Sequence, residues 1–158
     1  FLKTYPALFA ADPKRRRKAE RVSKRVKDMV EILASSPLLG TAKGDGLTVT
    51  YHDPCHASRG QGLVAEPRDF LAKLPGVTYT EMPEADWCCG GAGAYALSHQ
   101  SLSQSVLDRK MENFRKTNAD ILVTSCPACI IHLSYGMRRH GLTATVCHIS
   151  EMARGIGR

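Results

Sequence analysis

Residues 121–129 read ILVTSCPAC, an apolar run that leads directly into two cysteines. Ile121–Thr124 predicts a buried strand, because short runs of β-branched and apolar residues favour one. Pro127 predicts the first turn of a helix, since proline lacks an N–H that would be unpaired there anyway. The stretch therefore predicts a strand that ends at a helix start bearing Cys126 and Cys129.

The same order of strand and helix recurs along the chain. Candidate strands are Leu47–Tyr51, Val77–Thr80, Ile121–Thr124 and Thr143–Val146, and candidate helices are Pro67–Leu74, Ser98–Lys116, Ala128–His140 and Ser150–Ile156. This alternation predicts an α/β fold with a small, mostly parallel sheet flanked by helices. In the longest helix we expect one buried side, formed by Leu102, Val106, Met111 and Phe114.

The first part of the chain predicts a helical arm. Asp12-Pro13 has the residue types of an N-cap and a first helical position. Apolar residues at helical spacing follow and predict one helix that ends near residues 35–37: Val22, Val26, Met29, Val30 and Leu33. With the glycine-containing connector Leu39–Gly46, this gives an arm over residues 1–45 and a cysteine-rich domain over 46–158.

Length and composition favour a globular domain. The chain has 158 residues, 43% of them hydrophobic, and a net charge of +7. It contains no run of the roughly 20 apolar residues that a membrane span needs, and no signal-peptide pattern. Because the chain starts at Phe1 without an initiator Met, we expect it to be a piece of a longer protein.

The positive charge belongs to one segment. Between Lys14 and Lys27 there are nine basic residues and one acidic residue, Glu20, so the segment carries +8 and the remainder −1. A solvated helix face, or a docking surface for an acidic partner subunit, anionic lipid or nucleic acid, would each fit this charge. No aromatic residue interleaves with the run, which argues against single-stranded nucleic acid.

Five of the six cysteines form one array. Each follows a predicted strand, at the carboxyl edge where open α/β sheets bind ligands. Thiolates are the ligands of iron–sulfur clusters and of zinc. An even number of cysteines could also form disulfides, but an adjacent pair and the absence of a signal peptide favour reduced metal ligands. The array is Cys55, Cys88, Cys89, Cys126 and Cys129.

A glycine-rich stretch, residues 90–94, follows the adjacent pair. Gly90, Gly91 and Gly93 allow the backbone to approach an inorganic group closely and offer N–H groups to its sulfides. A phosphate-binding loop is disfavoured, because Ala96 stands where the third glycine would be. A cubane cluster or a zinc site uses four cysteines, so either one cysteine is spare or the cluster is not a simple cubane.

Other residues have less specific roles. We expect Cys147 to be a small buried apolar residue, and Trp87 to be a packing lid over the site. Residues 108–110 are expected to cap loops through salt bridges. Hydrogen bonds around the site, rather than direct ligation, are expected from His52, His56 and His148.

On these cysteines the sequence resembles the cysteine-rich CCG domain. That domain occurs in one of the subunits of heterodisulfide reductase and in iron–sulfur subunits of glycolate oxidase, lactate-utilisation and anaerobic glycerol-3-phosphate dehydrogenase complexes. Residues 51–55, 88–95, 108–110 and 148–152 are most similar to the glycolate oxidase and lactate-utilisation branch. Residues 5–28 resemble the segment that precedes the last CCG domain there.

The resemblance implies a [4Fe–4S] cluster, cubane or noncubane, held by the five cysteines of the array. It also implies an upstream ferredoxin-like module and a first CCG domain in the full-length chain. The domain would relay electrons from a flavoprotein subunit that oxidises glycolate or lactate, as the iron–sulfur subunit of an oxidoreductase and not its substrate-oxidising subunit. We expect no nucleic-acid partner and a cytoplasmic location, or the inner face of the membrane through a quinone-linked complex.

Two alternatives remain open from the sequence. One is a heterodisulfide reductase-like subunit that reduces disulfides at a noncubane cluster. The other is a structural zinc module, for which four of the five cysteines suffice.

Overall fold

The computed structural model describes residues 1–36 and 46–154 of the chain. Its centre is a four-stranded sheet of order β2-β1-β3-β4, in which each neighbouring pair is parallel. The predicted α/β fold with a small parallel sheet is therefore confirmed. The strands are β1 (Leu47–Tyr51), β2 (Val77–Tyr79), β3 (Ile121–Thr124) and β4 (Thr145–His148).

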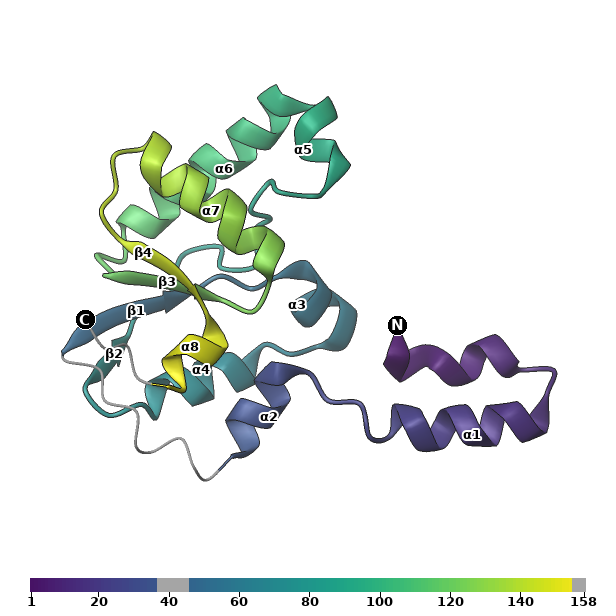
Figure 1. Cartoon of the computed structure of the whole chain (residues 1–158). Helices are drawn as coiled ribbons and strands as arrows, with labels where there is room; N and C mark the ends of the chain where they lie inside the picture. The colour runs from purple at the N-terminus through teal and green to yellow at the C-terminus, as the bar shows by residue number, and fades with distance from the viewer. Residues whose placement is uncertain (37–45, 155–158) are drawn as a thin grey trace.

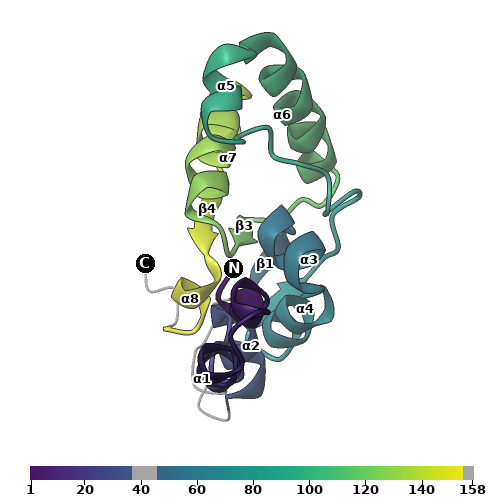
Figure 2. The ribbon, with the colours of Figure 1, turned by 90° about the vertical axis from the view of Figure 1, so that its right-hand side faces the viewer.

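Helices cover both faces of the sheet (Figure 1). α6 and α7 lie over one face, whereas α2, α4 and α8 lie over the other, and the view in Figure 2 shows the same separation. The helices of the described residues are η1 (Leu2–Phe9, a 3₁₀ helix), α1 (Pro13–Ser23), α2 (Met29–Ser35), α3 (Cys55–Gln61), α4 (Ala65–Ala72), α5 (Ala94–Ser98), α6 (Gln100–Arg115), α7 (Pro127–Arg139) and α8 (Ile149–Met152).

Strand β3 shows how the sequence builds these layers. Ile121 and Val123 point into the apolar core shared with α2, α4 and α8, while Leu122 points into the core shared with α6 and α7. This follows from the period of two along a strand. All four residues of β3 are buried, as expected for a parallel strand covered on both faces.

The order of the strands creates a switch point between β1 and β3. After β1 the chain crosses through α3 and α4 to β2 on one side, and it then crosses through α5 and α6 to β3 on the other side of β1. Ligands of open α/β sheets bind outside the carboxyl ends of strands at such a point. The residues that follow β1 and β3 are therefore the first place to search for a site.

The prediction of one helix through the arm was wrong, because the chain forms α1 and α2 with a break at residues 24–28. Asp28 starts a new helix there: its side chain accepts from the N–H of Val30, and Glu31 accepts from the N–H of Asp28 at 2.7 Å. Such a capping box favours a helix start over continuation. Of the predicted stripe, Val30 and Leu33 are buried, whereas Val22 and Met29 are exposed.

The predicted long helix Ser98–Lys116 is present as the single helix α6, and a separate short helix, α5, precedes it. His99, at φ −130° and ψ 54°, separates α5 from α6. Leu102 is exposed, so its assignment to the buried side was wrong, while Met111 and Phe114 are buried as predicted. The buried side of α6 consists of Ser103, Leu107, Lys110, Met111, Asn113 and Phe114.

Several bounds differ from prediction. β4 begins and ends two residues later than expected, so Cys147 lies inside the strand and not after it. The short helices η1, α3 and α5 were missed, and α3 has a single buried residue, Ala57, to signal it. Residues 39–45 of the predicted connector and the predicted end at Ile156 lie outside the described residues, and the division after residue 45 stays a prediction.

Candidate metal centre

Cys55 begins α3 directly after β1. The chain leaves the strand through His52, whose N–H donates to the carbonyl of Val123 at 2.9 Å and so extends the pairing with β3. Pro54 is the extended N-cap residue, and Cys55 occupies the first helical position with an exposed side chain. The first thiol of the array is thus at the predicted carboxyl edge of the sheet.

Cys126 and Cys129 flank the first turn of α7. Cys126 is the extended N-cap, Pro127 is the first helical residue, and Cys129 follows two positions later with its side chain buried. The predicted helix start is confirmed. Because Tyr51 of β1 pairs with Val123 of β3, α3 and α7 begin at the same edge of the sheet, as Figure 1 shows.

Cys88 and Cys89 lie on the long loop between β2 and α5. The N–H of Gly90 donates to the sulfur of Cys88 at 3.3 Å, and the N–H of Gly91 donates to the sulfur of Cys89 at 3.4 Å. The glycines therefore present backbone donors to sulfur, which is the arrangement that stabilises thiolates and tunes sulfur ligands. Gly93 has φ +56° and precedes α5.

Gly90 could not be replaced without moving the backbone. Its φ is +87°, and a Cβ on it would lie 2.5 Å from the carbonyl oxygen of Ser103 on α6. The hydroxyl of Ser103 in turn donates to the Gly90 carbonyl at 2.8 Å. The loop is thus seated against α6 at the residue that follows the cysteine pair.

The fold brings three buried ligand-type side chains together. The sulfur of Cys89 lies 3.3 Å from that of Cys129, and a ring nitrogen of His52 lies within 4.8 Å of both sulfurs. His52 is 1% exposed, and its Nδ1 has no hydrogen-bond partner among the described residues. A buried nitrogen without a hydrogen-bond partner is costly unless a further group satisfies it.

The protonation equilibria of the thiols reflect their crowding. The hydrogen bond to Cys129 is the largest cause that raises the pKa of Cys89, to about 12. The hydrogen bond to Cys89 and burial raise the pKa of Cys88 well above its usual range. Burial, with the nearby charge of Lys110, lowers the pKa of His52 to about 3, so this imidazole is neutral.

Three side chains of α6 hold the loop just before the cysteine pair. Arg109 and Asn113 bind the carboxylate of Glu84 at 2.8 and 2.6 Å, and the Nζ of Lys110 donates to the carbonyls of Glu84 at 2.6 Å and Ala85 at 3.1 Å. Glu84 itself has φ +53°, which a non-glycine residue adopts rarely. These contacts confirm for Arg109 the expectation that residues 108–110 cap a loop.

The buried Lys110 was missed by sequence reasoning. The signal was present, because Lys110 falls on the helical spacing of Leu107 and Phe114, both of which are buried. Asp108 has another role: it contacts His140 at 2.6 Å and Arg139 at 3.5 Å on the surface.

A second set of contacts holds the chain between β1 and Cys55. Arg68 of α4 binds both carboxylate oxygens of Asp53 at 3.0 and 2.8 Å and both oxygens of Glu81 at 2.8 and 2.7 Å. Asp53 is 3% exposed, and its N–H donates to the carbonyl of Ala85 at 3.0 Å. The loops that carry Cys55 and Cys88–Cys89 are therefore tied together. Nothing in the sequence pattern signalled Arg68.

The other residues singled out in the sequence have different positions and contacts. Cys147 is buried, as predicted, and packs in the core on the α2, α4 and α8 side of the sheet, away from Cys89 and Cys129. His148 caps α8 by accepting from the N–H of Ser150. Trp87 stacks under the guanidinium of Arg109, 4.2 Å from its ring centre. That Trp87 covers the site stays a prediction.

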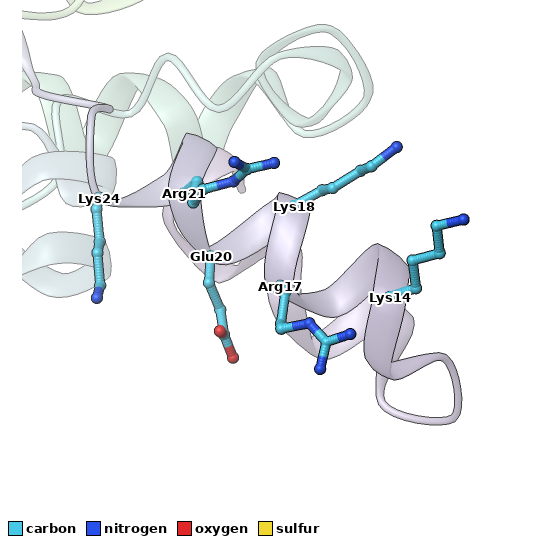
Figure 3. Close-up of a pocket in the computed structure, with 6 residues that line it drawn as sticks. All are labelled: Lys14, Arg17, Lys18, Glu20, Arg21 and Lys24. Carbon is cyan, nitrogen blue, oxygen red and sulfur yellow. The ribbon is translucent and has the colours of Figure 1, made fainter.

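The basic segment forms a projecting arm. η1 and α1 lie side by side and extend away from the sheet (Figure 1). The ring of Tyr5 in η1 makes edge contacts with Phe1 and Phe9. Figure 3 shows basic side chains that leave α1 in different directions around a shallow depression, rather than converging on one point. This favours a solvated helix face, and docking of an acidic partner stays a prediction.

Within the described residues, no helix is both long and apolar enough to cross a membrane. The fold and the site define an α/β protein with a cysteine-rich site at the switch point of a parallel sheet.

Comparison with known proteins identifies the family. Residues 49–134, which include all five cysteines of the array, match the cysteine-rich domain family designated CCG. The chain belongs to this family, and the predicted resemblance is confirmed.

Relatives with longer chains carry the same region. The chain is 31% identical over 156 residues to a probable glycolate oxidase iron–sulfur subunit of Bacillus subtilis, covering 96% of this chain and 35% of the relative. It is 30% identical over 155 residues to lactate utilization protein A of Oceanobacillus iheyensis, covering 96% and 62%. It is 38% identical over 117 residues to a subunit of the fumarate reductase (CoM/CoB) of Methanothermobacter marburgensis, covering 74% and 24%. The chain thus spans less than two thirds of each of these relatives.

Proposed function

We propose that the chain holds an iron–sulfur cluster through Cys55, Cys88, Cys89, Cys126 and Cys129, with Gly90, Gly91 and Gly93 lining it. The observation that carries this proposal is the buried sulfur pair of Cys89 and Cys129 beside the buried imidazole of His52, whose Nδ1 has no partner among the described residues. The donors fit such a group, because thiols supply the ligands and the N–H groups of Gly90 and Gly91 already point at sulfur.

The cluster, when bound, would supply one-electron redox chemistry. The chain's own residues bind and orient it: α3, α7 and the loop before α5 present the thiols, and Lys110 and Arg68 fix the two loops. Burial of Cys89 and Cys129 keeps water from one side of the site, while the exposed Cys55 and Cys88 leave another side open. A site with one open side suits exchange of electrons with a partner.

We further propose that the domain relays electrons from a flavoprotein subunit that oxidises a 2-hydroxy acid such as glycolate or lactate. The support is the near-complete coverage of this chain by the glycolate oxidase and lactate utilization relatives. No substrate pocket is required of the chain for this role.

A disulfide-reducing role is the second candidate. The relative named for CoM/CoB has the higher identity, 38%, although over a smaller part of the chain. An exposed Cys55 and Cys88 beside a cluster would be accessible to an exogenous thiol or disulfide.

Iron and acid-labile sulfide measured after anaerobic purification and reconstitution test the cluster. We expect both in near-equal amounts, with visible absorption that bleaches on reduction. Zinc without iron would instead support the structural zinc module, and a chain that takes up no iron would contradict the proposal. Reoxidation of the reduced, loaded protein by a disulfide separates the second candidate from the relay.

A further inference from the structure

The core beneath the cysteine pair contains a lysine with no carboxylate partner. Lys110 is 0% exposed, and among the described residues it forms no ion pair, its Nζ being bound by the carbonyls of Glu84 and Ala85. Lysine is almost never fully buried unless paired, because an uncompensated buried charge is strongly destabilising.

The acidic groups around Lys110 are already neutralised by arginines. Asp86, Asp53, Cys89 and Glu84 are the groups whose negative charge would favour a charged Lys110. Each of the three carboxylates has its own guanidinium.

The pairs are Asp53 with Arg68 at 2.8 Å, Asp86 with Arg59 at 4.0 Å, and Glu84 with Arg109. Of the four groups, the sulfur of Cys89 is left without a cation of its own in the described part of the chain. The counter-charge of Lys110 is therefore to be sought on the side of the cysteines.

We propose that Lys110 is the buried counter-charge of the metal centre, an electrostatic positioning residue that stabilises the reduced form of the bound cluster. The inference rests on the proposed function, since a metal or cluster binds thiolates and so places negative charge beside this ammonium. Burial lowers the pKa of Lys110 to about 8, which still leaves it mostly protonated at pH 7. Its two carbonyl contacts hold it in the core in this charged form.

The contacts of Lys110 allow the effect of its charge to be tested separately from its hydrogen bonds. The hydrogen bonds of Lys110 go to backbone carbonyls three and four residues before the cysteine pair and not to the sulfurs, so its effect on the cluster acts through space. A neutral donor at this position can still bind the two carbonyls but cannot compensate the cluster. The reduced cluster carries one more negative charge than the oxidised cluster, and removal of the ammonium is expected to disfavour it.

The test is a redox titration of the reconstituted 158-residue chain, with Lys110→Gln, Lys110→Met and Lys110→Arg. We expect the neutral variants to shift the reduction equilibrium at least about tenfold toward the oxidised form, which is about 59 mV for a one-electron couple. Lys110→Arg keeps the charge and is expected to remain near the wild-type potential. Lys116→Met is the matched control, because Lys116 is an exposed lysine on the following turn that contacts Asn113.

Each outcome of the titration either supports or overturns the role of Lys110. Folded, loaded neutral variants with the wild-type potential would overturn the role of Lys110 and leave the cluster itself standing. A wild-type chain that binds no iron would overturn both proposals. If the neutral variants do not fold, Lys110→Arg decides alone: the wild-type potential supports the proposal, and a tenfold shift in a folded, loaded protein refutes it.

Discussion

The sulfur atoms of Cys89 and Cys129 lie 3.3 Å apart although the residues are 40 positions apart in the chain. Cys89 is carried by the crossover from β2 to β3, and Cys129 by the crossover from β3 to β4. The contact therefore depends on the seating of the loop against α6 and on the start of α7 at Pro127. Cys89 and Cys129 lie on the same side of the sheet, where their side chains share one apolar core.

Replacement of Cys129 tests whether this pair holds the metal. We expect Cys129→Ala to lower iron affinity by at least about 10- to 100-fold. Losses of this size are typical when a residue that only supports a metal ligand is replaced, and loss of a ligand itself should cost no less. Cys147→Ala is the matched control, because Cys147 is equally buried but packs on the opposite face. Iron content after anaerobic reconstitution measures the effect. Equal iron in the two variants would contradict the assignment.

Gly90 is expected to be the least replaceable glycine of the loop. Gly90→Ala introduces a Cβ 2.5 Å from the Ser103 carbonyl oxygen at a φ of +87°. The strained φ and the overlap together should cost about 3 kcal/mol in the free energy of unfolding. Gly62→Ala is the control: its φ is +73° but nothing lies within 4 Å, so about 1 kcal/mol is expected.

Urea denaturation of the metal-free chain measures both Gly variants. A Gly90→Ala variant no less stable than Gly62→Ala would show that the loop moves freely away from α6.

The fold was predictable where local signals agree with tertiary packing. Ile121–Thr124 is apolar on both faces, and β3 is buried on both, so its bounds were predicted correctly. The arm shows the opposite case, because Val22 and Met29 continue a helical spacing although both side chains are exposed. There, local capping by Asp28 decides where the helix is interrupted, and periodicity alone does not reveal it.

The cysteines of the site were predictable from the sequence, but the side chains that hold their loops in place were not. The array and its place at the sheet edge follow from residue type and strand order. Arg68 and Lys110, however, act through contacts with Asp53 and Glu84, which lie 15 and 26 positions away in the chain. Helical spacing could place Lys110 on the buried side of its helix, but it does not reveal which residues Lys110 and Arg68 contact, because these contacts depend on how the helices pack against the sheet.

Arg68 should be the main electrostatic support of the loop that carries Cys55. Arg68→Met leaves Asp53, which is 3% exposed, without its partner, and breaking a buried pair costs about 3–5 kcal/mol. Arg59→Met is the control, because its pair with Asp86 spans 4.0 Å between two exposed side chains and is worth about 0–1 kcal/mol. Chemical denaturation should separate the two clearly. Similar losses would mean that Asp53 finds another partner or water.

The start of α2 should weaken in acid. The hydrogen bond from Lys3 is the largest cause that lowers the pKa of Glu31 below its usual range. The folded state therefore favours the carboxylate. This stability is complete above the ordinary pKa of a glutamate and is lost as the pH falls through the lowered value of the folded state.

We expect Glu31→Gln to lose about 1 kcal/mol at pH 7 and to lack this acid-dependent part. Hydrogen exchange of the amides of α2 between pH 6 and pH 3, corrected for intrinsic exchange, measures this loss of stability. Glu20→Gln is the control, since Glu20 pairs only at the surface with Arg16. An unchanged pH dependence in Glu31→Gln would assign the effect to another carboxylate.

Variants of His52 test whether its unpaired Nδ1 contacts the bound cluster. If Nδ1 contacts the bound cluster, His52→Leu should release iron to a chelator about 10- to 100-fold faster, as is typical when an outer contact of a metal site is lost. His52→Asn can present its amide near the position of Nδ1 and should release iron at a rate closer to the wild type. His56→Ala is the matched control, because His56 follows Cys55 in the same segment but is exposed. Equal release rates for the Leu and Asn variants would show that His52 serves packing alone.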